Sequence, residues 1–101
     1  MMVKEVAEKL GLKILSVGAD QQVTGGYVSD LLSDVIANAE EGSLWITVQR
    51  HLNIIAVAQL KKLAGIIPYY AYIDERIASI LSKFGKIKDN ASPELQKIRR
   101  D

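Results

Sequence analysis

The residues best suited to chemistry in this sequence form one polar block between two apolar segments. The polar members of this block are Thr47, Gln49, Arg50, His51 and Asn53. The block lies where a strand-like segment, 44–48, ends and before the apolar segment 54–60 begins. In open α/β sheets, loops at this position bind ligands, and free N–H groups at the start of a helix attract anions. Because Arg50 supplies a positive charge, we expect the block to bind a small anionic ligand, with a nucleotide as one candidate, or a partner protein.

The same residues also have a structural interpretation. Asn53 is a residue type that caps the start of a helix, His51 can be a surface imidazole with satisfied hydrogen bonds, and Arg50 can be a solvated charge. The sequence leaves both interpretations open.

The residue inventory excludes most familiar catalytic machinery. Cysteine is absent and His51 is the only histidine, so a zinc site would have to rely on carboxylates. The glycines fit neither the phosphate-binding loop nor the dinucleotide-binding pattern. No nucleophile-elbow spacing supports a Ser-His-Asp triad around His51. We therefore predict that the chain is not an enzyme, has no catalytic or metal-binding residues and carries no cofactor.

The elements that must position the polar block follow from the spacing of apolar residues. The predicted strands are 12–17, 22–28, 44–48 and 64–67. The predicted helices are 3–10, 31–39, 54–60, 74–84 and 93–100. Gly11 and Gly85 are expected to end helices, and Pro68 to end an inner strand or place it at an edge.

Two of these elements carry further expectations. The pair Gly25–Gly26 follows Thr24 and would weaken a regular strand, so it predicts a bulge or a bend. The segment 54–60 is apolar nearly all round, which predicts a helix buried on most sides.

The whole chain reads as one α/β domain with a small, mainly parallel sheet flanked by helices, because helix and strand signals alternate along its length. Its 101 residues are 49% hydrophobic and 25% charged, as in a globular domain. The formal net charge of +1 draws the chain neither to nucleic acid nor to anionic lipid. No apolar run reaches the roughly 20 residues that span a bilayer, so we expect a cytoplasmic protein.

The chain also resembles a known family in two segments, GYVSDLLSDV at 26–35 and WITVQRHLNIIAVA at 45–58. Together with the rest of 23–67, these segments resemble stand-alone members of the DRTGG domain family. More distantly, the pattern is similar to the N-terminal domains of HPr kinase/phosphorylase and of the Mur ligases, which carry no phosphate-binding loop. The resemblance implies a DRTGG-like α/β domain over 1–88, followed by a basic C-terminal helical tail over 89–101.

The residues that name the family are an Asp-Arg pair after an inner strand and a Thr-Gly-Gly after the next. In this chain those positions are Gln49–Arg50 and Pro68–Tyr70, so only Arg50 matches. Family members are often found beside nucleotide-sensing CBS domains. The resemblance therefore implies a regulatory or adaptor module more than an enzyme.

Two functional readings remain. The first is a non-catalytic regulatory module that binds a small anionic ligand or a partner protein through the polar block. The alternative is a homo-oligomeric adaptor without a small-molecule ligand, which the high apolar fraction and three tyrosines, Tyr69, Tyr70 and Tyr72, favour. The basic residues Lys97, Arg99 and Arg100 lack interleaved aromatic residues, so we expect no nucleic-acid partner.

Overall fold

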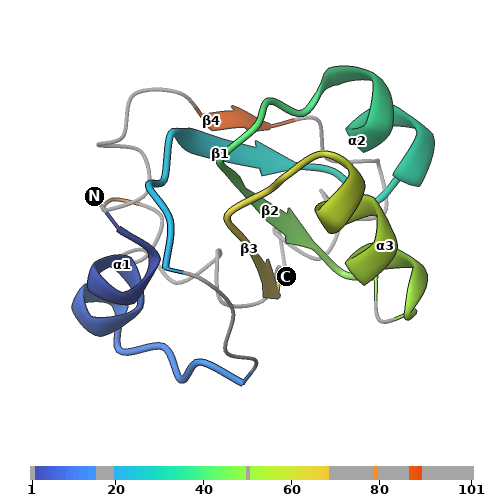
Figure 1. Ribbon diagram of the computed structural model, residues 1–101. Coiled ribbons are helices and arrows are strands. Elements are labelled where there is room, and N and C mark those ends of the chain that lie inside the picture. Colours follow the sequence, from blue (N-terminus) through green and yellow to red (C-terminus); the bar gives the residue numbers. More distant parts are fainter. Residues whose placement is uncertain (1, 16–19, 50, 69–78, 80–86, 90–101) are drawn as a thin grey trace.

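The computed structural model describes residues 2–15, 20–49, 51–68, 79 and 87–89. Its centre is a four-stranded sheet in the order β3-β2-β1-β4, in which every neighbouring pair is parallel (Figure 1). The strands are β1 (Gly25–Val28), β2 (Ser43–Thr47), β3 (Gly65–Pro68) and β4 (Ile87–Asp89). The helices are α1 (Val3–Leu10), α2 (Leu32–Asn38) and α3 (Asn53–Leu60). The chain is thus an α/β domain with a small parallel sheet flanked by helices, as its sequence predicts.

Helices cover both faces of the sheet. In β2, Leu44 and Ile46 belong to the hydrophobic cluster that includes Val6 of α1, whereas Trp45 belongs to the cluster that includes Val35 of α2 and a residue of α3. This division follows from the strand geometry, because successive side chains of a strand point to opposite faces. Figure 1 shows the result: α2 and α3 lie side by side, and α1 lies apart from them. Trp45 and Ile46 are both fully buried, which makes β2 a central strand as expected.

The first helix occupies the predicted residues and ends at the predicted glycine. Gly11 adopts a left-handed conformation with φ of 66°. Its N–H donates to the carbonyl of Glu8, and the N–H of Leu12 donates to the carbonyl of Ala7. These two bonds form a Schellman motif, which satisfies carbonyl groups at the helix end and favours glycine at this position.

The segment after α1 is not the predicted strand over 12–17, at least in its described part. Residues 12–15 have no strand partner. Leu12 packs against the core, whereas Leu15 is 87% exposed. The near-alternation of apolar residues in this segment therefore does not correspond to a strand. Residues 16 and 17 lie outside the described residues.

The glycine pair does not produce the predicted bulge. Gly25 pairs with Ser43 and Gly26 with Leu44, and the register continues without interruption to the end of β1. All four residues of β1 are buried. A strand covered on both faces and paired on both edges tolerates glycine because its neighbours fix the backbone.

One further expectation about an element is wrong. Helix α3 is not buried on most sides, because Val57 is its only residue in the buried class. The strand β3 lies at an edge of the described sheet and Pro68 is its last residue, which is one of the two placements that the proline predicts. An edge suits this segment because proline cannot donate a hydrogen bond to a further strand.

The fourth strand was not predicted from the sequence. Residues 87–89 pair with Gly26, Tyr27 and Val28, so β4 runs across the predicted boundary between the domain and the tail. Within the predicted helix 74–84, Ser79 is described and is helical. The tyrosines 69, 70 and 72, Gly85 and the predicted helix 93–100 lie outside the described residues.

Candidate functional site

The carboxyl ends of β1 and β2 lie next to each other, because these strands are parallel neighbours with Val28 opposite Ile46. The residues that follow β1, Ser29 and Asp30, therefore share one edge of the sheet with those that follow β2. This is the edge at which open α/β sheets bind ligands. We call the segments 29–31 and 48–53 the carboxyl-edge loops.

Ser29 fixes the first of these loops. It is fully buried, and its N–H donates to the carbonyl of Ile46 over 3.1 Å. Its carbonyl accepts a 2.8 Å hydrogen bond from the indole Nε1 of Trp45, and its Oγ accepts a 3.2 Å bond from the N–H of Leu31. The chain is therefore held at three points as it leaves the sheet and enters α2.

Thr47 and Gln49 fix the second loop and join it to the first. Thr47 is 2% exposed, and its Oγ1 accepts a hydrogen bond from the N–H of Gln49 over 3.2 Å. The Gln49 side chain donates from Nε2 to the carbonyl of Asp30 over 2.6 Å. Both loops consequently form one hydrogen-bonded unit. The structure brings these two predicted site residues together, but the polar atoms named here are used in hydrogen bonds within the protein.

His51 and Asn53 are placed differently, since both are exposed at the beginning of α3. The N-cap position of α3 belongs to Leu52 and has no side-chain hydrogen bond, so Asn53 is the first helical residue and does not cap the helix. The polar tips of His51 and Asn53 face solvent on the same loop. Arg50, the predicted positive charge, lies outside the described residues.

The N–H groups at the start of α3 are partly engaged by the chain itself. The N–H of Ile54 donates to the carbonyl of His51, and that of Ile55 to the carbonyl of Leu52, each over 3.1 Å. These tight turns take up two donors that a helix N-terminus otherwise offers to an anion. Recognition of a ligand here would depend more on side chains than on the helix end.

Ser29 and Asp30 were not identified from the sequence as members of this edge. Asp30 is half-buried, and its Oδ1 is fully enclosed. The pairing of the strands could have identified these two residues. Had 25–28 and 44–48 been paired as parallel neighbours, the residues after both strands would have been placed together.

The described residues hold no group of three or more histidine, cysteine, aspartate or glutamate side chains that could bind a metal ion. Among the same residues, no helix has the length and apolar character needed to cross a membrane. What the described part of the carboxyl-edge loops offers is a set of hydrogen-bonding groups, held together at Gln49 and Asp30.

Comparison with known proteins finds no relative: no family model matches the chain, and neither a curated protein nor a solved structure matches it. The resemblance to the DRTGG domain family rests on the quoted residues and stays a prediction.

Proposed function

We propose that this chain is a non-catalytic regulatory module that binds a small anionic ligand, with a nucleotide as the first candidate, at its carboxyl-edge loops. The observation that carries the proposal is the hydrogen bond from Gln49 to the carbonyl of Asp30. It holds the loop after β2 against the loop after β1, while His51 and Asn53 on the same loop remain exposed.

Rigid loops favour binding because less conformational entropy is lost when the ligand arrives. His51 offers an imidazole and Asn53 an amide, and both can donate hydrogen bonds to phosphate or carboxylate oxygens. In the sequence, Arg50 stands between Gln49 and His51 and would add the charge that makes such bonds strong. The anion would bind beside the exposed His51 and Asn53.

Binding without catalysis is the better supported reading of this edge. The hydroxyl of Thr47 is buried and accepts a hydrogen bond from Gln49. The hydroxyl of Ser29 is buried and accepts one from Leu31. Within the described residues, neither oxygen is hydrogen-bonded to His51, as a nucleophile would be to its base.

The test is a thermal-shift and calorimetric screen of the full chain against nucleotides, phosphorylated metabolites and inorganic phosphate. A ligand at a concentration 100 times its Kd should stabilise the fold by about 2.7 kcal/mol. In a domain of this size that raises Tm by about 10–20 °C. Replacing Arg50, His51 or Asn53 by alanine should weaken binding about ten-fold, the cost of losing one hydrogen bond to a charged group.

Lys13→Ala is the matched control, because it also removes a positive charge and Lys13 is an exposed residue outside the carboxyl-edge loops and outside α2 and α3. It should leave both Tm and affinity unchanged. A screen without any hit, or a hit whose affinity Arg50→Ala, His51→Ala and Asn53→Ala all leave intact, would refute a ligand site at this edge.

The alternative function, a homo-oligomeric adaptor, is favoured by a separate observation. Several large apolar side chains on the α2 and α3 layer are exposed to solvent. They lead to the inference below.

A further inference from the structure

None of the exposed residues of α2 and α3 is charged, and large apolar side chains are among them. Five of the nine large hydrophobic residues that are exposed in the described chain lie on these helices or at their ends. They are Leu31 at 58%, Ile36 at 42%, Leu52 at 83%, Ile55 at 50% and Leu60 at 67% exposure. We call this surface the helical face.

Helix α3 contributes most of it. Residues 52, 55, 56 and 59 recur at helical spacing and are all exposed, so they form one stripe on the side of α3 away from the buried Val57, and the exposed Leu60 lies at the border of this stripe. No residue of α3 is charged. A helix on the surface of a monomer normally directs charged and polar side chains outward, and a large exposed apolar patch marks an interaction site.

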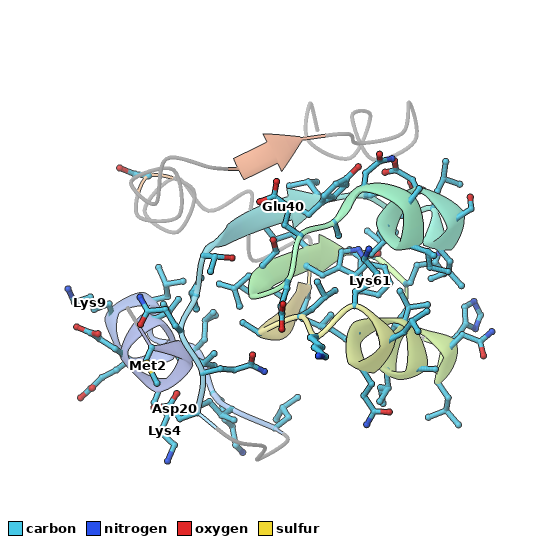
Figure 2. All side chains as sticks on the ribbon, turned by 45° about the horizontal axis from the view of Figure 1, so that its top comes forward. Met2, Lys4, Lys9, Asp20, Glu40 and Lys61 are labelled. Atoms are coloured by element: carbon cyan, nitrogen blue, oxygen red, sulfur yellow. The ribbon has the colours of Figure 1, made fainter. Side chains whose placement is uncertain are left out.

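Charges of opposite sign stand side by side at one end of this face. Glu40 and Glu41 follow α2, and Lys61 and Lys62 follow α3. The two segments are neighbours, because the N–H of Gly42 donates to the carbonyl of Lys62 over 2.9 Å. Within the described chain, no ion pair joins either glutamate to either lysine. Figure 2 labels one residue of each pair, Glu40 and Lys61.

We propose that the helical face binds a second copy of this chain, with the two-fold axis running along the groove between α2 and α3. A two-fold interface uses the same patch on both subunits. Rotation about an axis along the helices places α2 of one subunit on α3 of the other and keeps their carboxyl ends together. Glu40 and Glu41 then face Lys61 and Lys62 of the partner subunit.

The charges select this arrangement over the other face-to-face one. An axis running across the helices would place α2 on α2 in opposite directions, so the acidic end of one helix would meet Asp30 at the start of the other. Like charges in contact are destabilising, whereas the axis along the helices brings unlike charges together around an apolar centre. The inference does not depend on ligand binding, although the helical face borders the proposed ligand site and shares Leu31 and Leu52 with the carboxyl-edge loops.

The first experiment measures mass by light scattering and sedimentation of the full chain at micromolar concentrations. We expect twice the monomer mass of 11.1 kDa. Ile55→Glu, within the stripe, should give a monomer, with the dissociation constant raised by at least about 30-fold, as expected for a central interface residue. Leu60→Glu, at the border of the stripe, should also weaken the dimer, but by less. Leu15→Glu is the control, since Leu15 is 87% exposed and does not lie on the helical face.

The second experiment tests the direction of the axis by charge reversal. Glu41→Lys and Lys62→Glu should each weaken the dimer by about five-fold at low salt, because each places like charges together in two symmetric copies. The double variant Glu41→Lys/Lys62→Glu restores unlike pairs between subunits and should regain the affinity of the original chain. Circular dichroism checks that each variant is folded.

A monomer at high micromolar concentration overturns the proposal, as does equal loss of the dimer in Leu15→Glu. A dimer that survives both apolar substitutions overturns the helical face as the interface. A double charge variant no better than the single ones overturns the axis. The nucleotide screen decides the ligand site separately, since a stable dimer without any ligand hit refutes only the proposed function.

Discussion

At the scale of single residues, Lys62 holds a backbone conformation that suits glycine better. Its φ is 53°, and it has the same place in the hydrogen-bond pattern at the end of α3 that Gly11 has at the end of α1. The N–H of Lys62 donates to the carbonyl of Gln59, and that of Leu63 to the carbonyl of Ala58, which repeats the Schellman motif. A side chain at such a φ costs about 1 kcal/mol. Lys62→Gly should therefore be more stable than Lys62→Ala by about 1 kcal/mol, and Gly11→Ala should lose about the same amount.

Urea unfolding measures both differences, and the comparison of glycine with alanine at position 62 cancels the loss of the lysine charge. Equal stability of the two variants would show that the motif does not strain the backbone. The contrast between the two helix ends also shows where residue-level prediction works. A glycine after an apolar helix pattern, such as Gly11, predicts a left-handed backbone conformation. Nothing in the sequence of Lys61 and Lys62 predicts that Lys62 adopts one.

At the scale of elements, helix α2 depends on an anchor that connects it to β1. Its seven residues are too few for a stable isolated helix, and its N-cap has no side-chain hydrogen bond. Tyr27, 5% exposed on β1, donates from its hydroxyl to the Asp34 carboxylate, with both oxygens at 2.9 Å. Asn38, one turn further along α2, donates to the same carboxylate. Tyr27→Phe should therefore destabilise the fold by about 1.5–3 kcal/mol, the value of a hydrogen bond to a charged group.

A double-mutant cycle with Asp34→Ala measures the bond itself. A coupling energy near zero would mean that Tyr27 stabilises the fold by packing alone. The hydrogen bond between Tyr27 and Asp34 was not predicted, because it joins a strand to a helix. The spacing of apolar residues describes each element separately.

The same limit explains which elements the sequence predicts. The central strand β2 and helix α1 have patterns strong enough to be read locally. The strand β4 has three residues and takes its place from pairing with β1, which no local pattern contains. The exposed side of α3 was misjudged for a related reason, since an apolar helix looks the same whether the sheet or another molecule covers it.

The candidate site at the carboxyl ends of β1 and β2 was predicted in part. The sequence indicates that a polar block follows β2, because that strand and the polar residues after it are both recognisable. It does not indicate that Gln49 turns its amide toward Asp30, since that bond depends on the pairing of β1 with β2. The residues after β1 are therefore brought into the site by the pairing of the strands, which the local sequence does not predict.

At the scale of the whole molecule, folding and association should be linked. Trp45 is the only tryptophan and is fully buried, so its fluorescence reports the loss of the core directly. If two copies bind through the helical face, only the folded chain dimerises, and mass action makes Tm depend on protein concentration. A tenfold rise in concentration contributes about 1.4 kcal/mol per dimer, or about 0.7 kcal/mol per chain. For a domain of this size, that raises Tm by about 3–5 °C. Ile55→Glu should abolish the dependence, whereas Leu15→Glu should retain it. A Tm that stays constant across this range for the original chain would show that folding and association are not linked.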